Sequence, residues 1–299
     1  MSSASMSLRI VYLGMPGAFS SLPLQSLLAN NIEITAVAMT KSQTAWQPDH
    51  RLAVTQPAGH INLAELASSA NIPLWELADV NSDEVLLALQ QLHPDLVLVA
   101  CFPDRLPERF LNTPRYGCYN LHPSLLPAYR GPAPMFWQFY MDERMTGVSL
   151  HKMIGEFDSG EIVEAREVVL QPGLSGMQAD VRLATVGGEL MQGLIEQIRS
   201  GRLSLMPQSD KRKSHYPWPT ENDFYLDPQW PAEHAFNFMR GTAHWGRPYF
   251  VMSPGLDLPP LAQAQSFDHS LTLAAECDYQ GNEILIQFSP GVLRAVVAG

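Results

Sequence analysis

Residues 8–29, LRIVYLGMPGAFSSLPLQSLLA, decide the fold of this 299-residue chain. The apolar run Leu8–Leu13 is typical of a buried strand, and Gly14-Met-Pro-Gly17 is typical of a tight turn. The segment Ser20–Ala29 then has the amphipathic spacing of a helix. A strand, a turn and a helix in this order predict the first half of a βαβ unit.

The following segments repeat the alternation of strand and helix. β-rich runs at Ile32–Met39 and Asp95–Ala100 predict strands, and the apolar spacing in Leu63–Ala70 and Asp83–Leu92 predicts helices. The run DLVLVA at residues 95–100 suits a strand that is buried on both faces. Strands alternating with helices imply right-handed crossovers and a parallel sheet, so the predicted fold class is α/β.

Three further strands and a long helix are predicted before residue 200. The strands are expected at Tyr116–Leu121, Thr146–Met153 and Glu161–Leu170. The helix is expected over Met177–Arg199, although Gly187-Gly188 weakens its middle because glycine is a poor helix former.

A length of 299 residues favours two domains. The predicted division is a first domain at 1–208, a proline-rich linker at 209–226 and a small β-rich domain at 227–299. The last part is expected to begin with a helix near Pro231–Arg240 and to contain strands at Leu271–Ala275 and Glu283–Phe288.

The composition indicates a globular protein of the cytoplasm. Apolar residues make up 46% of the chain and charged residues 16%, and no apolar run approaches the roughly 20 residues of a membrane span. The first residues lack the basic and apolar regions of a secretion signal. Three widely spaced cysteines suggest no disulfides, and no metal-ligand spacing is present, so no metal is expected.

The most informative stretch for function is NLHPSLLPAYRGPAP, residues 120–134. Asn120 and His122 are two residues apart at the end of a predicted strand, so their side chains project from the same face. Ligands bind at the carboxyl ends of strands in open α/β sheets. A second polar loop, Gly155–Gly160, brings Asp158, whose carboxylate can orient His122 and support its charged form.

These three groups suit acyl transfer to an amine. When an amine attacks a formyl carbon, the negative charge on the formyl oxygen can be stabilised by Asn120 and His122. One such donor typically lowers the barrier by roughly 3 to 4 kcal/mol. The proton of the amine needs a base, which is Asp158, His122 or a water between them. An Asn-x-His pair on its own favours a structural role, whereas the pair together with the neighbouring loop and Asp158 favours chemistry.

Other polar residues carry alternatives that the sequence leaves open. Arg130 can bind an anionic part of a substrate or hold its own loop. At most one of His151 and Lys152 faces a ligand, since neighbours on a strand alternate, and a core or surface position is the simpler interpretation. Gly14-Met-Pro-Gly17 lacks the GxGxxG pattern, so no dinucleotide is expected.

The run NLHPSLLPAYRGPAP and the later GVSLHKMIGEFDSGEIV closely resemble the formyltransferase family that uses 10-formyltetrahydrofolate. Further similarity lies in PDLVLVACFPDRLPERFL and DFYLDPQWPAEHAFNFMRG, so the resemblance covers most of the chain. It implies a Rossmann-like domain with a mostly parallel sheet, followed by a smaller barrel-like domain. It also implies 10-formyltetrahydrofolate as the co-substrate.

The resemblance assigns roles to individual residues. Asn120, His122 and Asp158 match the catalytic residues of the family. The residues that match its folate site are Phe102, Leu106, Ser124, Leu125, Leu126, Pro127 and Gly155.

The amine acceptor is the open question. Within the family, the chain is most similar to the branch that formylates methionyl-tRNA. The resemblance implies that an insertion at Thr40–His60 would bind tRNA, but this segment holds only Lys41 and Arg51 as basic residues. Residues 214–299 hold three Arg and no Lys against nine Asp plus Glu. Because phosphate contacts supply most non-specific affinity for nucleic acids, a small amine such as a nucleotide-linked amino sugar is the alternative. Hydrolysis of formyltetrahydrofolate is a third possibility.

Overall fold

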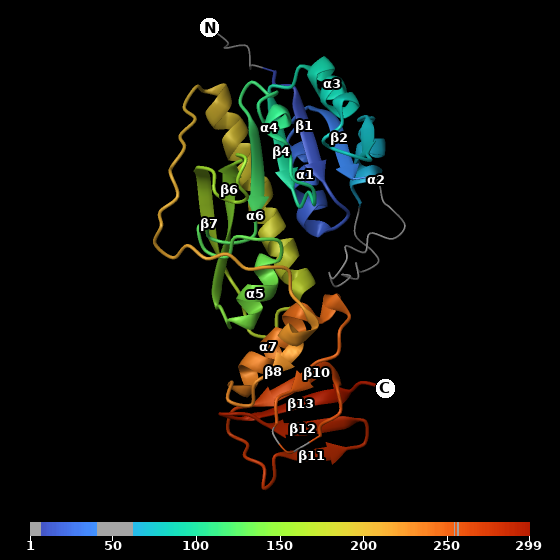
Figure 1. Cartoon of the computed structure of the whole chain (residues 1–299), viewed down its shortest axis with the longest axis vertical. Helices are drawn as coiled ribbons and strands as arrows, with labels where there is room; N and C mark the ends of the chain where they lie inside the picture. Colours follow the sequence, from blue (N-terminus) through green and yellow to red (C-terminus); the bar gives the residue numbers. More distant parts are fainter. Residues whose placement is uncertain (1–6, 41–61, 254, 256) are drawn as a thin grey trace.

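The computed structural model describes residues 7–40, 62–253, 255 and 257–299 (Figure 1). A large sheet with its helices occupies one half of an elongated molecule, and a smaller sheet occupies the other. The predicted insertion at Thr40–His60 lies, apart from Thr40, outside the described residues. None of the helices in the described ranges is long and apolar enough to cross a membrane.

The larger unit is built on a seven-stranded sheet in the order β3-β2-β1-β4-β5-β6-β7. The strands are β1 (Ile10–Gly14), β2 (Ile34–Thr40), β3 (Leu74–Leu77), β4 (Leu96–Ala100), β5 (Cys118–His122), β6 (Met145–Lys152) and β7 (Ile162–Val169). Strands β1 to β5 pair in parallel, whereas β5–β6 and β6–β7 are antiparallel. The predicted mostly parallel α/β sheet is confirmed.

Helices cover both faces of this sheet. They are α1 (Ala18–Ala29), α2 (Leu63–Ser69), α3 (Asp83–Leu92), α4 (Glu108–Leu111) and α6 (Gly176–Arg199). Helices α1, α2 and α6 pack on the face that carries Tyr119 and Leu121. Helices α3 and α4 pack on the opposite face, which carries Cys118. Asn120 and His122 follow Cys118 at intervals of two, so the alternation of β5 directs them to the α3–α4 side.

Helix α6 runs for 24 residues without a break, through the two glycines that were expected to weaken it. A Cβ on Gly187 would lie 2.7 Å from Cδ1 of Leu121, and one on Gly188 would lie 2.9 Å from Cβ of Ser26. The absence of these side chains lets α6 approach β5 and α1 closely. Packing on the sheet therefore offsets the low helix propensity of glycine.

The smaller unit is a four-stranded antiparallel sheet in the order β10-β13-β12-β11. Its strands are β10 (Leu261–Asp268), β11 (Cys277–Gln280), β12 (Glu283–Gln287) and β13 (Val292–Val297), joined by α7 (Ala232–Thr242) and a short parallel pair, β8 (Tyr225–Leu226) and β9 (Phe250–Val251). The β-rich second unit is confirmed, as are its first helix and the strand near Glu283. Helix α5 (Pro134–Tyr140) adds Phe136 and Trp137 to its core.

The strand predicted at Leu271–Ala275 is wrong. At that point the chain is turning, because the carboxylate of Asp268 accepts hydrogen bonds from the backbone N–H groups of Ser270 and Leu271. Leu271 is largely exposed, and the next strand begins only at Cys277. The apolar residues of this segment therefore do not form a buried face of a strand.

Candidate active site

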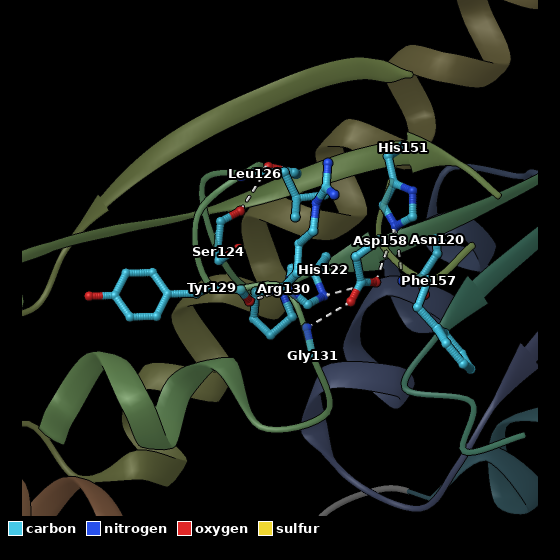
Figure 2. Close-up of polar contacts among 12 residues, drawn as sticks. Asn120, His122, Ser124, Leu126, Tyr129, Arg130, Gly131, His151, Phe157 and Asp158 are labelled. Carbon is cyan, nitrogen blue, oxygen red and sulfur yellow. Dashed lines mark hydrogen bonds and ion pairs between the residues drawn. The ribbon is translucent and has the colours of Figure 1, made fainter. Parts of the chain in front are cut away.

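The end of β5 places His122 against a carboxylate (Figure 2). Its Nε2 lies 2.8 Å from the carbonyl oxygen of Tyr129, and its Nδ1 lies 3.5 Å from Oδ1 of Asp158. Because a carbonyl oxygen only accepts, Nε2 must carry a hydrogen. A second proton on the ring would therefore sit on Nδ1 and face Asp158. The imidazole is almost completely buried, which strengthens this interaction.

Asp158 is held from several sides. The backbone N–H of Gly131 donates to its Oδ2 at 2.9 Å. Its Oδ1 lies between two imidazoles, 3.5 Å from Nδ1 of His122 and 3.7 Å from Nε2 of His151. The residue has a left-handed backbone, with φ of 51°, a conformation that surrounding contacts must stabilise in a residue with a side chain. The carboxylate is thus fixed relative to both rings.

His151 joins the site, although it was not among the predicted site residues. It lies opposite Asn120 in the β5–β6 pair, and its Nε2 is 3.3 Å from Nδ2 of Asn120. Its Nδ1 donates to the backbone carbonyl of Lys152 at 3.0 Å, so Nε2 is free to accept from the Asn120 amide. Burial lowers the pKa of His151 to about 4 despite the opposing influence of Asp158. A neutral His151 therefore fixes which end of the Asn120 side chain is the NH2 group.

The segment Ser124–Pro127, which matches the folate loop of the family, is anchored on β6. The hydroxyl of Ser149 donates to the carbonyl of Ser124 at 2.7 Å and accepts from the N–H of Leu126 at 3.0 Å. The Ser124 hydroxyl donates to the carbonyl of Ala128. Ser124 and Leu126 are buried, and Leu125 lies directly against Gly147. Their side chains thus support the loop from within, and Pro127 is half-buried.

The other residues that match the folate site lie on two loops that touch. Leu106 is buried in the α3–α4 core, and Phe102 packs against that core and is half-buried. Arg105, between them, donates to the carbonyl of Gly155, and its guanidinium lies 5.8 Å from the ring centre of the exposed Phe157. The loop after β4 and the loop that carries Asp158 are therefore in contact.

The contacts of Arg130 show what it does within its own loop. The side chain is buried, and its Nη2 donates to Oε1 of Gln208 at 2.5 Å. Gln208 in turn donates to the carbonyls of Asp158 and Gly160. Arg130 therefore stabilises the loop in this structure.

A second enclosed carboxyl lies on α6 of the same unit. Burial raises the pKa of Asp180 to about 7, and no described residue donates a hydrogen bond to it. Burial and the nearby Asp180 raise the pKa of the Cys101 thiol to about 12, so this cysteine stays protonated. Within the described ranges, no group of three or more His, Cys, Asp or Glu side chains is arranged to hold a metal ion.

Comparisons with known proteins show the family of the chain. The model of the formyl transferase family matches residues 8–195. The methionyl-tRNA formyltransferase of Thermotoga maritima is 30% identical over 78% of this chain and 72% of its own length, and that of Synechococcus sp. (strain JA-3-3Ab) is 33% identical over 78% and 71%. The structure of an N-formyltransferase from Helicobacter canadensis with folinic acid and dTDP-3-aminofucose covers 97% of this chain and 99% of that one, with a TM-score of 0.69 at 14% identity. The chain belongs to the formyl transferase family.

Proposed function

We propose that this enzyme transfers the formyl group of 10-formyltetrahydrofolate to the primary amine of methionyl-tRNA, with Asn120, His122 and Asp158 as the catalytic residues. The observation that carries the proposal is the pairing of the His122 ring with the Asp158 carboxylate, beside the Asn120 amide, at the carboxyl end of β5. The named methionyl-tRNA formyltransferases among the relatives support this acceptor.

In the proposed reaction the nitrogen of the amine attacks the formyl carbon, a new C–N bond forms, and negative charge develops on the formyl oxygen. One N–H of Asn120 points to His151, which leaves the other N–H to donate to this oxygen. A separation of 3.5 Å between His122 Nδ1 and Asp158 is long for a hydrogen bond. The carboxylate can therefore accept the amine proton, which passes to N10 of the folate as the C–N10 bond breaks.

We propose that the folate lies along the two touching loops beside this centre. Phe102, Leu106 and the Ser124–Pro127 segment would form one side, and Gly155 with the backbone near it the other. Since Leu106, Ser124 and Leu126 are buried, they would act mainly by shaping the backbone that meets the ligand.

A small amine is the second candidate for the acceptor, and the charges of the second unit favour it. Each of its three arginines already has a partner: Arg240 donates to the carbonyl of Gly173, Arg247 lies 3.5 Å from Glu221, and Arg294 lies 2.9 Å from Glu283. Among the described residues after 213 there is thus no arginine or lysine side chain without a partner to meet a phosphate.

The test is release of tetrahydrofolate from 10-formyltetrahydrofolate in the presence of methionyl-tRNA or, separately, of nucleotide-linked amino sugars. Release that requires charged tRNA and falls steeply with added salt supports the proposal. Release that requires an amino sugar supports the second candidate. Release without any amine indicates hydrolysis and contradicts both.

A further inference from the structure

Gln208 contacts the backbone of Asp158 itself and of Gly160, two residues further along the same loop. Its side-chain amide donates to the carbonyl of Asp158 at 2.8 Å and to the carbonyl of Gly160 at 2.7 Å. It lies about 50 residues away in sequence, beyond α6 and just after the short pairing of Met206 with Ile162. A single side chain therefore uses both N–H groups to fix the turn at Asp158.

Arg130 determines the orientation of that amide. Its guanidinium donates to Oε1 of Gln208, so the oxygen of the amide faces Arg130 and the NH2 group faces the two carbonyls. Arg130 makes no ion pair with any residue in the described ranges, and its buried Nε has no hydrogen-bond partner among them. Holding a charged donor inside the protein has a cost in desolvation, and the bond to Gln208 is the one hydrogen bond of this side chain among the described residues.

The chain segment that carries Arg130 also forms a hydrogen bond to the carboxylate of Asp158. The next N–H, that of Gly131, donates to Oδ2 of Asp158. The backbone of this segment is in turn paired with residues 214–216: the N–H of Arg130 donates to the carbonyl of Ser214, and the N–H of Tyr216 donates to the carbonyl of Arg130. The rings of Tyr129 and Tyr216 stack with their centres 5.3 Å apart and add to this contact between the two segments.

We propose that Arg130 and Gln208 are positioning residues for the formyl transfer, a role that rests on the function proposed above. Together they hold the loop of Asp158 so that its carboxylate faces Nδ1 of His122. The left-handed backbone of Asp158 needs such support, because an L-residue with a side chain leaves this conformation when its contacts are lost. Without the two bonds from Gln208, Asp158 turns away, and the imidazole loses the group that supports its charged form.

The variant that isolates this role is Gln208→Glu. Glutamate keeps the length of the side chain and offers Arg130 an ion pair, but it removes both N–H donors and sets negative charge against two carbonyl oxygens. The matched control is Gln171→Glu, because Arg182 donates to Oε1 of Gln171 at 3.0 Å on the surface, without any contact to the Asp158 loop. Gln208→Leu serves as the second variant if Gln208→Glu does not fold.

We expect Gln208→Glu to lower kcat per folded protein at least about tenfold, with KM for both substrates within about threefold and a reduced Tm, because two carbonyls lose their donor. The acidic limb of the kcat–pH profile should shift as well, whereas Gln171→Glu should change none of these values. A kcat within about twofold of the wild type in a folded Gln208 variant would overturn the proposal. A fall in kcat that merely follows the unfolded fraction would overturn it too.

One readout needs no turnover and separates this inference from the proposed function. In a ¹⁵N-histidine spectrum, the ring nitrogens of His122 should change their chemical shifts in Gln208→Glu and keep them in Gln171→Glu. If the wild type released no tetrahydrofolate with any amine, the proposed function would fail while this measurement still tested the placement of Asp158. Unchanged chemical shifts of the His122 ring would overturn the positioning role even in an active enzyme.

Discussion

The two units of the molecule bury their polar side chains in different ways. In the larger unit, His122 and His151 lie near one carboxylate, and Ser124 and Ser149 fix the loop beside them. In the smaller unit, the buried polar groups of α7 bond to backbone at the junction of the two units. His234 lies 2.9 Å from the carbonyl of Tyr140, and Asn237 accepts from the N–H of Gly173.

This contrast shows that a buried histidine is not by itself a sign of catalysis. Burial lowers the pKa of His234 as it does that of His151, so both rings are neutral near pH 7. His234 has a fixed structural partner and stacks on Trp230 at 4.0 Å. His151 instead lies beside an amide and a carboxylate at the carboxyl end of β5, the edge at which open α/β sheets bind ligands. The neighbours of the ring distinguish the two roles.

The largest effects should come from the residues around Asp158. We expect Asn120→Ala, His122→Ala and Asp158→Ala each to reduce kcat at least about a hundredfold, because they remove the amide donor, the ring that pairs with the carboxylate, and the carboxylate itself. His122→Ala and Asp158→Ala also remove hydrogen bonds and should lower Tm, so kcat is taken per folded protein. Steady-state tetrahydrofolate release and thermal unfolding would measure the two quantities.

His234→Ala is the matched control in the other unit. It should lower Tm, because the carbonyl of Tyr140 loses its donor, and leave kcat of the folded fraction within about threefold. A near-normal rate in any of the three site variants would remove that residue from the mechanism. A hundredfold loss in folded His234→Ala would break the contrast between the two units.

A smaller effect is expected at Gly131. Its φ of +117° is unfavourable for other residues, and a Cβ would clash with the carbonyl oxygen of Tyr216. Gly131→Ala must therefore displace the N–H that holds Asp158, and we expect kcat to fall about thirtyfold with a loss of stability of about 2 kcal/mol.

Gly281 in the hairpin between β11 and β12 gives the comparison. Its φ is +71°, and no described atom lies within 4 Å of the place that a Cβ would occupy. Gly281→Ala should therefore cost about 1 kcal/mol from backbone strain alone. Chemical denaturation and kcat of both variants test this. Equal rates in the two proteins would show that Gly131 does not hold the carboxylate in place.

His151 should show the next effect. His151→Phe removes the acceptor of the Asn120 amide, and we expect kcat to fall about tenfold as that amide loses its orientation. His151→Gln offers a new acceptor and should retain kcat within about threefold. If both variants lost activity equally, the imidazole itself, and not its accepting nitrogen, would be required.

The sequence predicts the larger sheet well because its inner strands are continuous apolar runs between turn residues. β4 is buried at every position, and its apolar pattern LVLVA is typical of a strand buried on both faces. β3 and β10 are absent from the sequence-based assignment for the opposite reason. In β10 only Leu261 and Ala264 are buried, and its exposed polar residues are typical of a surface loop.

For the site, the sequence identifies residues that are adjacent along the chain but not those that pairing brings together. Asn120 and His122 share a strand end, so their proximity follows from spacing. His151 reaches Asn120 through the antiparallel register of β5 and β6, and Gln208 reaches Asp158 from beyond α6. The prediction of an antiparallel pair between residues 116–121 and 146–153 would have been the signal for His151.

The smallest expected effect is on the pH dependence of stability, and it concerns Asp180, the second enclosed carboxyl of the larger unit besides Asp158. Asp158 accepts from Gly131, whereas no described residue donates to Asp180, and burial raises the pKa of Asp180 to about 7 from 3.8. The folded protein thus retains a proton on Asp180 that the unfolded chain releases above about pH 4. Stability from this group is complete below about pH 4 and is lost as the pH rises to about 7. Asp180→Asn should remove that loss, so its Tm should exceed the wild-type value more at about pH 8 than at about pH 5, with little change in kcat. A Tm difference that is the same at both pH values would mean that Asp180 is solvated like a surface carboxylate.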